Sequence, residues 1–273
     1  ISTYAQIVKT SPDSLGGYKK VLDAKGKLLA WYKPDVPGAA YVHVAKLASE
    51  FIKSGTPVDP KTGLKIYLIA CCFQGPHMRP QQDFVAGKTW DDWMHNPACV
   101  FAGMVQSLAL DYRVFSGDST YIDVVREMLD YQIKNGTTPI EWPWGGVPYA
   151  SSDPGVKIYN GATKWERDGM RGDGLFGIEP DKVGELGYAY VKFYEVTGDE
   201  KYLKAGLLCA DALAKNVRDV KADASNFTET KLGQSPWPFR VNARNGAVIS
   251  EYTSHVIDCL KLFDELIRIK DRI

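Results

Sequence analysis

A helix–turn–helix pattern occurs twice in this sequence and constrains its fold more than any other feature. The segment VFSGDSTYIDVV, which starts at Val114, recurs about 80 residues later as EVTGDEKYLKAG, which starts at Glu195. In each copy an amphipathic segment ends at a Gly-Asp pair, and a second amphipathic segment then opens on an aromatic residue. Copies of one such unit indicate a repeat architecture in which neighbouring units bury each other's apolar faces. The sequence therefore predicts an array of helical hairpins.

Apolar residues at helical spacing extend this pattern along the chain. They predict helices over residues 41–55, 97–115, 121–136, 183–194, 203–217 and 252–267. The apolar run LKIYLIACCF, residues 64–73, fits either a buried helix or a strand, and we favour a helix. Asp118 and Asp199 follow the glycines of the two turns. We expect each to cap the next helix, because a carboxylate there accepts orphan backbone N–H groups.

The N-terminal segment has a different character. GYKKVLDAKGKLLAWY, residues 17–32, contains two apolar-rich runs around a turn at residues 23–26, which predicts a β-hairpin. Pro34 and Pro37 close this segment. We therefore expect an N-terminal β-hairpin segment over residues 1–36 and a helical-hairpin domain over residues 37–273. Because the sequence starts at Ile1 rather than Met, we expect a processed or trimmed chain.

The two Gly-Asp turns predict where the chemistry lies. Short turns join the helices at one end of the array, so the long connections between hairpins emerge together at the opposite end. These connections are residues 73–96, 136–180 and 218–247. Connections longer than about 15 residues in a compact domain are usually functional or disordered. Here they hold every tryptophan except Trp31, namely Trp90, Trp93, Trp142, Trp144, Trp165 and Trp237.

Charge and cysteine content exclude several classes of partner. The 33 basic and 33 acidic residues cancel, so no overall field attracts nucleic acid. No apolar run approaches the roughly 20 residues of a membrane span, and we expect no membrane partner. Three cysteines fall in helical apolar patterns and are expected to be buried thiols: Cys99, Cys209 and Cys259. Cys72 with His77 is not a zinc spacing, and Glu251 with His255 lacks a third ligand, so we expect no metal and no cofactor.

The connection over residues 136–180 combines the residue types that sugar cleavage requires. Hydrolysis uses two carboxylates that flank the glycosidic bond, and indole rings stack on the C–H faces of sugars. The candidate catalytic residues are Asp168, Asp173, Glu141 and Glu179. The candidate substrate-binding residues are Trp142, Trp144, Tyr149, Trp165, Arg171, Trp237, Arg240 and His95. Other interpretations stay open: turn formation for Asp168 and Asp173, a helix start for Glu179, anchoring for each tryptophan, and loop-bracing ion pairs for the arginines.

Helical hairpins with a G-D-x-x-Y turn at one end and tryptophan-rich loops at the other resemble the six-hairpin (α/α)-toroid enzymes of carbohydrate chemistry. The resemblance covers roughly residues 97–270. It implies an all-α fold, a toroid or partial toroid of helical hairpins, with the small β-hairpin near the N-terminus. Arg171-Gly172-Asp173-Gly174 is also similar to the R-G-x-G segment of unsaturated glucuronyl and rhamnogalacturonyl hydrolases, with Leu175 where those families usually have Trp.

The resemblance leaves three functions in competition. We expect a glycoside hydrolase that acts on a poly- or oligosaccharide, with or without uronic acids, by Asp/Glu acid–base catalysis. The first alternative is a polysaccharide lyase with a Tyr or His base, for which Tyr149, Tyr159, His95 and His255 are available. The second is a non-catalytic glycan-binding or scaffold protein. In each case the partner is a carbohydrate, and we expect a secreted or periplasmic location.

Overall fold

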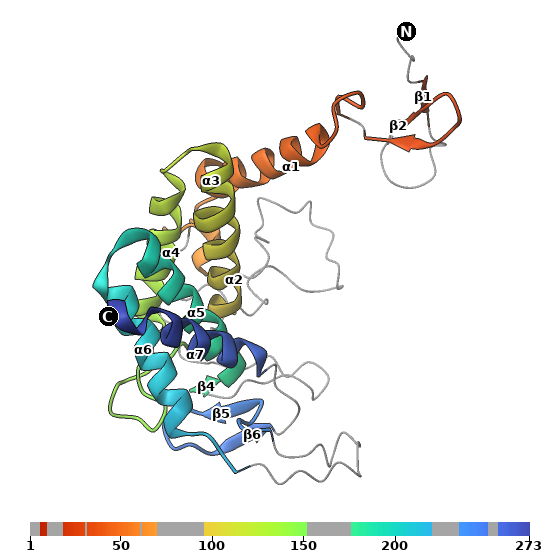
Figure 1. Cartoon of the computed structure of the whole chain (residues 1–273). Helices are drawn as coiled ribbons and strands as arrows, with labels where there is room; N and C mark the ends of the chain where they lie inside the picture. The colour runs from red at the N-terminus through yellow and green to blue at the C-terminus, as the bar shows by residue number, and fades with distance from the viewer. Residues whose placement is uncertain are drawn as a thin grey trace, which may run out of the picture. The chain divides into compact units, whose positions relative to one another are not determined.

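The computed structural model describes residues 6–9, 19–30, 32–60, 62–69, 96–151, 176–219, 235–250 and 256–273. Contacts divide the chain into two compact units, Ile1–Gly55 and Thr56–Ile273 (Figure 1). The larger unit consists mainly of helices, with a small antiparallel sheet. This confirms the predicted all-α class of helical hairpins.

The first unit contains the predicted β-hairpin. Strands β2 (Lys19–Leu22) and β3 (Leu28–Leu29) pair in antiparallel register, and β1 (Gln6–Lys9) adds a third strand on the other edge of β2. In the turn, Asp23 Oδ1 accepts the backbone N–H groups of Lys25 and Lys27 at 2.9 and 2.8 Å. Helix α1 (Ala39–Glu50) and the π-helical turn η1 (Phe51–Gly55) follow, so the helix predicted to end at residue 55 is confirmed.

The second unit corrects one sequence prediction. Within residues 64–69, the described part of the apolar run, the chain forms a single 3₁₀ turn, η2 (Ile66–Leu68), rather than a helix. Lys65 pairs with Val58 in an isolated β-bridge, and the Ile66 N–H donates to the Pro57 carbonyl at 2.9 Å. These bonds hold the backbone against residues 57–58. The side chains of residues 66–69 are all buried, so the apolar residues of the run do not recur at helical spacing.

Both predicted hairpins are present. In the first, α2 (Pro97–Met104), the π-helix η5 (Val105–Tyr112) and α3 (Arg113–Ser116) form one continuous helix. Its partner is α4 (Tyr121–Asn135), which ends at Gly136 as predicted.

The second hairpin consists of α5 (Pro180–Thr197) and α6 (Glu200–Lys215). A last helix, α7 (Ile257–Ile269), is followed by the 3₁₀ turn η6 (Lys270–Arg272).

The two Gly-Asp turns have nearly the same geometry. Gly117 and Gly198 end their helices in the left-handed region, with φ of 73° and 70°, which a residue with a side chain rarely adopts. Asp199 is the N-cap of α6 and accepts the Lys201 N–H at 3.3 Å, as predicted. Asp118 also accepts the N–H two residues later, that of Thr120, at 2.9 Å. Thr120, however, is the N-cap of α4, so the prediction that Asp118 caps this helix is wrong. The sequence repeat is therefore a structural repeat, and both aspartates accept hydrogen bonds from nearby backbone N–H groups.

The helices of this unit pack around α5. α5 packs between α2 and α7, while α4 packs on α2 and η5, and α6 packs on α5 (Figure 1). Gly184 and Gly187 allow this close approach. A Cβ atom at Gly184 would lie 2.5 Å from the backbone nitrogen of Cys259 in α7, and one at Gly187 would lie 2.8 Å from the Cβ of Cys209 in α6. A larger side chain at either position would push the helices apart.

Ion pairs join α5 to α7 near the end that holds the Gly-Asp turns. Lys192 Nζ lies 2.8 Å from Glu195 and 2.9 Å from Glu265 of α7. Arg272 lies 2.6 Å from Glu195, and Arg268 contacts both carboxylates. Burial raises the pKa of Glu195, but hydrogen bonds with Glu265, Lys192, Arg268 and Arg272 outweigh it and hold that pKa well below its usual range.

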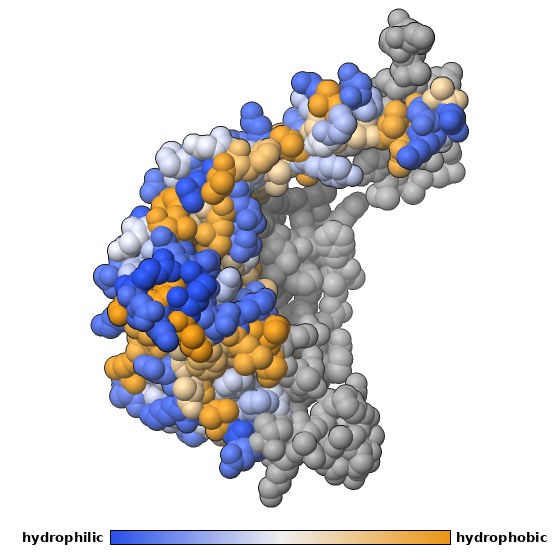
Figure 2. All heavy atoms as spheres, viewed as in Figure 1, coloured by the Kyte–Doolittle hydropathy of each residue, from blue (hydrophilic) through white to orange (hydrophobic). Residues whose placement is uncertain are grey.

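The continuous helix over residues 97–116 is more apolar than the sequence patterns suggested. It is 20 residues long, its mean hydropathy reaches 1.2, and by length and composition alone it matches a membrane-spanning helix. Of its most apolar stretch of 18 residues, 33% is buried inside the protein, where α2 and η5 pack on α4 and α5. Figure 2 shows apolar residues at the surface in this region, where Val114 and Phe115 are 68% and 64% exposed. The helix includes Gln106, Asp111 and Arg113, so it is not an unbroken apolar run, and the absence of a membrane partner stays a prediction.

Candidate functional site

Two of the long connections meet at the end opposite the Gly-Asp turns, as predicted. β4 (Gly177–Ile178) pairs with β5 (Arg240–Asn242), and β5 pairs with β6 (Val248–Ser250), all antiparallel. β4 leads directly into α5, so this sheet lies at the N-terminal end of that helix. It joins the connection over residues 136–180 to the one over residues 218–247. The connection over residues 73–96 lies outside the described residues except for Asn96.

The first part of the long connection folds back onto this sheet. The Thr138 hydroxyl donates to the Trp144 carbonyl at 2.6 Å, and the Trp144 N–H donates to the Ala243 carbonyl at 3.3 Å. The Ala150 N–H donates to the Gly177 carbonyl at 3.0 Å. Chain segments on either side of residues 152–175 are thus held together by a backbone hydrogen bond. We name the region formed by residues 136–151, 176–179 and 235–250 the loop end.

A buried ion pair lies at the centre of the loop end and joins two predicted site residues. Arg240 Nε donates to Glu179 Oε1 at 2.8 Å, and Arg240 Nη2 lies 2.7 Å from the same oxygen. The two side chains are only 10% and 6% exposed. The Arg240 guanidinium also lies 4.5 Å from the centre of the Phe239 ring. A charge buried this deeply is tolerated only with such a partner.

Glu179 combines two of the interpretations offered by the sequence. It is the N-cap residue of α5, and Pro180 follows in the first turn, so the predicted helix start is confirmed. Within the described residues, however, its carboxylate accepts no hydrogen bond from the first turn of the helix. The carboxylate faces Arg240 of β5 instead. Arg240 in turn has the loop-bracing ion pair that was one of its two interpretations.

Most described aromatic candidates are anchors. Trp144 and Trp237 are 2% and 5% exposed, and Trp237 Nε1 donates to the Leu213 carbonyl at the end of α6 at 2.8 Å. Tyr149 is also buried, and burial raises the pKa of its hydroxyl. Trp142 is half-buried, with its ring edge-on to Phe176 at 5.0 Å. Among the described residues, Trp142 is therefore the indole best placed to meet a ligand.

Glu141 lies next to Trp142 in an exposed turn. Its side chain is exposed although both of its sequence neighbours, Ile140 and Trp142, are apolar. Arg244 is exposed on the same end of the molecule, with its guanidinium 5.9 Å from the centre of the Phe176 ring. Glu141, Trp142 and Arg244 are thus accessible polar and aromatic groups of the loop end.

The remaining predicted site residues lie outside the described residues. Asp168, Asp173, Trp165 and Arg171 belong to residues 152–175, and His95 precedes the described Asn96. Their roles stay predictions. The segment that carries Asp168 and Asp173 joins two described residues of the loop end, Ser151 and Phe176.

Metal and thiol chemistry find little support in the described residues. No group of three His, Cys, Asp or Glu side chains among them could hold a metal ion. Cys209 and Cys259 are buried as predicted, and burial raises the pKa of each thiol to about 12. Cys99 is exposed, which corrects the expectation that it is buried.

One feature of the site escaped the sequence analysis. Polar residues form a row along α5, on the face that borders α2 and α7: Lys182, Glu185, Tyr188 and Lys192. Lys182 and Glu185 form an ion pair at 2.8 Å. Their three- and four-residue spacing was visible in the sequence, but a charged row on a helix usually means a solvated face.

No protein-family model matches the sequence, and no curated protein matches it. Two solved structures are similar to the chain at low identity. A D-mannose isomerase is 14% identical with a TM-score of 0.42, over 66% of this chain and 39% of its own. A glycoside hydrolase family 76 mannosidase, Bt3792 from Bacteroides thetaiotaomicron VPI-5482, is 16% identical with a TM-score of 0.45, over 85% of this chain and 49% of its own.

Both neighbours are (α/α)-toroid carbohydrate-active enzymes, the class that the sequence pattern resembles. The chain spans half or less of the length of each. Both TM-scores are below 0.5, so what this chain does is inferred from its own residues.

Proposed function

We propose that the protein is a carbohydrate-active enzyme, a glycoside hydrolase that acts on a poly- or oligosaccharide at the loop end. The observation that carries this proposal is the buried Glu179–Arg240 pair, which lies where residues 152–175 leave and rejoin the described chain. That segment carries Asp168 and Asp173 in the sequence, and an exposed turn of the loop end carries Glu141 and Trp142. We expect these residues to supply the carboxylates and the indole that glycoside hydrolysis requires.

The ion pair limits the role of Glu179 in this reaction. A guanidinium within hydrogen-bonding distance favours the ionised carboxylate. An ionised carboxylate activates water or stabilises positive charge on the sugar ring, whereas the proton donor has to be a protonated acid. We therefore assign Glu179 the role of base or anchor, and the role of proton donor to Asp168, Asp173 or Glu141. Asp168 and Asp173 are our first choices, since Glu141 lies in an exposed turn.

The lyase alternative is weaker for the described residues. A lyase base has to lose its proton before it can remove one from the sugar. Tyr149, one of the tyrosines considered for this role, is buried, and burial raises the pKa of its hydroxyl, which keeps it protonated at neutral pH. Tyr159, His95 and His255 lie outside the described residues.

A second candidate function is glycan binding without catalysis. It is favoured by one observation: the most deeply buried carboxylate of the loop end, that of Glu179, is already neutralised by Arg240. A binding protein would keep the half-buried Trp142 and the ion pair as a scaffold, and it would tolerate the loss of Asp168 and Asp173.

Product analysis on a panel of polysaccharides separates these functions. The hydrolase releases new reducing ends without a new ultraviolet absorbance, because no conjugated double bond forms. A lyase gives both signals, and a binding protein gives neither while it still retains the polymer on an affinity gel. Since a polymeric substrate of this kind is met outside the cytoplasm, we also place the protein in the secreted or periplasmic class, which cell fractionation tests.

A further inference from the structure

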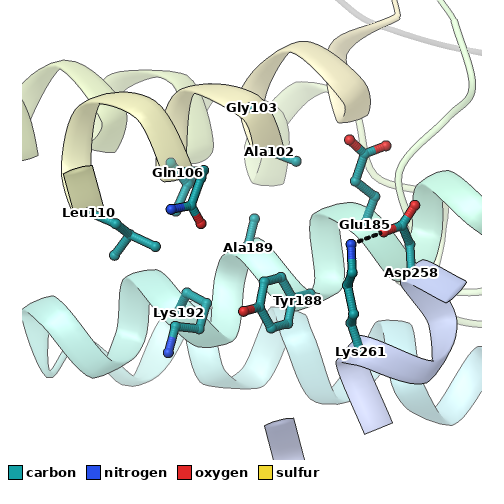
Figure 3. A pocket seen from close by; sticks show the side chains of 11 residues that line it. Ala102, Gly103, Gln106, Leu110, Glu185, Tyr188, Ala189, Lys192, Asp258 and Lys261 are labelled. Atoms are coloured by element: carbon teal, nitrogen blue, oxygen red, sulfur yellow. Dashed lines mark hydrogen bonds and ion pairs between the residues drawn. The ribbon is translucent and has the colours of Figure 1, made fainter. Parts of the chain in front are cut away.

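A groove lies between three helices of the larger unit, away from the Glu179–Arg240 pair. It is bordered by α2 and η5 on one side, by α5 along its floor, and by the first turns of α7 (Figure 3). We name it the inter-helix groove and define it by its lining residues, Ala102, Gly103, Val105, Gln106, Leu110, Glu185, Tyr188, Ala189, Lys192, Asp258 and Lys261. Its volume is ≈ 190 Å³, smaller than the roughly 300–1,000 Å³ of sites for drug-sized ligands. It therefore has room for one small ring.

Gly103 keeps the groove open. It lies inside α2, where glycine costs about 1 kcal/mol of helix stability relative to alanine. A Cβ atom there would meet no heavy atom within 4 Å, so packing does not require glycine at this position. Gly184 of α5 is the contrast, because a Cβ atom there would lie 2.5 Å from the backbone of α7. The missing side chain at residue 103 leaves free space on the groove side of α2.

The wall formed by η5 is a π-helix of eight residues, Val105–Tyr112. π-Helical turns are rare and occur frequently at functional sites. This one supplies Val105, Gln106 and Leu110 to the groove. The Gln106 amide nitrogen donates to the Asp111 carboxylate at 3.0 Å, which leaves the amide oxygen as an acceptor. The irregular segment of the helix is thus the one that borders the groove.

The charges around the groove cancel. Glu185 and Asp258 are acidic, and Lys192 and Lys261 are basic, so the formal charge of the lining is zero. Each charge also has a partner. Lys261 lies 2.9 Å from Asp258, as the dashed line in Figure 3 marks, Glu185 lies 2.8 Å from Lys182, and Lys192 pairs with Glu195 and Glu265. An additional charge on a ligand would find no free counter-charge among the lining residues.

Tyr188 provides the aromatic surface. It lies on α5 between Lys192 and Glu185, and Figure 3 shows its ring within the groove. Its hydroxyl has no hydrogen-bond partner among the described residues, and Ala102 and Ala189 beside it are small and apolar. An aromatic face next to unpaired hydroxyl and amide groups is the combination that binds a sugar ring, whose C–H faces stack while its hydroxyls form hydrogen bonds.

We propose that the inter-helix groove binds one uncharged sugar ring. The choice of a sugar as the ligand rests on the proposed function, whereas the preference for an uncharged ring rests on the cancelled lining charges. The groove is therefore a site for neutral sugar, in contrast to the uronic acids that the R-G-x-G resemblance suggested. The free acceptor of Gln106 and the hydroxyl of Tyr188 hold the ring hydroxyls.

Saturation-transfer NMR with the full 273-residue chain tests this proposal. The probes are D-glucose, D-galactose and D-mannose, with D-glucuronate as the charged probe. We expect at least one neutral sugar to bind and glucuronate to bind more weakly than the glucose it derives from. Gly103→Leu fills the groove and should weaken binding at least about tenfold, or about 1.4 kcal/mol. Tyr188→Phe, which removes only the hydroxyl, should weaken it to a smaller degree.

Gly103→Ala and Tyr131→Phe are the matched controls. The first makes the same backbone change with a side chain too small to fill the groove, and the second removes a tyrosine hydroxyl from α4, away from the groove. Both should bind as the wild type does. Because leucine and alanine both favour helix over glycine, the residue 103 variants should fold at least as well as the wild type. Wild-type affinity in Gly103→Leu, tighter binding of glucuronate, or no binding of any neutral sugar would overturn the proposal.

The outcome is separate from that of the proposed hydrolysis. If neutral sugars bind the groove but the protein shows no turnover, the groove proposal is supported and the hydrolase proposal is refuted. If turnover depends on Asp168 or Asp173 but Gly103→Leu does not change sugar binding, the hydrolase proposal is supported and the groove proposal is refuted.

Discussion

Removing one side of the Glu179–Arg240 pair should destabilise the larger unit strongly. Both side chains are at least 90% buried, and Arg240 Nη2 lies 2.7 Å from Glu179 Oε1. Loss of one partner from a buried ion pair costs about 3–5 kcal/mol, because the other charge is left without compensation. For a unit of this size each kcal/mol lowers the melting temperature by roughly 2–4 °C, so we expect a decrease of about 6–20 °C.

Urea denaturation followed by circular dichroism measures this effect in Glu179→Gln, Arg240→Met and the double variant. We expect each single change to cost about 3–5 kcal/mol, and the double variant to recover much of that loss, because replacing both charges of a buried pair is often nearly neutral. Lys201→Met is the control. It breaks an ion pair with Asp130 in which both side chains are 42% exposed, and such pairs contribute about 0–1 kcal/mol.

The same variants separate the two roles of Glu179. If the carboxylate acts only as an anchor, the double variant recovers turnover together with stability. If it takes part in the reaction, turnover stays low in every variant without the carboxylate, whatever its stability. Single variants as stable as Lys201→Met would refute the assignment of a buried, mutually dependent pair.

Three further predictions follow from the packing of the helices. Gly184→Ala should destabilise the protein by about 1–3 kcal/mol, since its Cβ would lie 2.5 Å from the α7 backbone, while Gly103→Ala should stabilise it slightly; thermal melts of both variants test this. Cys209 should resist alkylation at pH 8 until the protein unfolds, because burial raises the pKa of its thiol to about 12. Iodoacetamide treatment followed by peptide mass spectrometry tests this, and labelling of Cys209 in the native protein would refute it. The folded-state pKa of Glu195 is held below its usual value of 4.5, so the stabilisation by its carboxylate is present above that pH and is lost as the pH falls below it. The free energy of unfolding should therefore decrease less steeply with falling pH in Glu195→Gln than in the wild type. An unchanged slope in acid unfolding would contradict the ion network.

The sequence predicted the helical hairpins because their signals are local. A glycine that ends a helix in the left-handed region and an aspartate that accepts the N–H two residues later can both be recognised within a few positions. The end of the molecule at which the long connections meet then followed from chain geometry alone. Residues 64–69 were predicted wrongly because the consecutive burial of residues 66–69 removes the apolar periodicity on which the prediction depends.

The site was predictable as a set of residues but not as an arrangement. Glu179 and Arg240 were both named, yet 61 positions separate them, and nothing in the sequence indicates that they pair. Trp144 and Trp237 are buried and anchor the loops to the helices. Their burial depends on tertiary packing, which no local sequence pattern reveals. The groove around Gly103 combines residues of three helices that are far apart in the sequence. The sequence also does not distinguish a glycine that close packing requires, such as Gly184, from one that leaves free space, such as Gly103.

Turnover of a polysaccharide by Asp168→Asn and Asp173→Asn, compared with Asp118→Asn, tests the central claim most directly. Asp118 has a local backbone duty in the Gly-Asp turn at the opposite end, so its variant controls for the loss of an aspartate in a turn. The account predicts that at least one of the Asp168 and Asp173 variants loses turnover by about 10²–10⁴-fold, as expected for a missing acid or base, while Asp118→Asn keeps it. Full turnover in both of these variants, or an equal loss in Asp118→Asn, would contradict a catalytic site at the loop end.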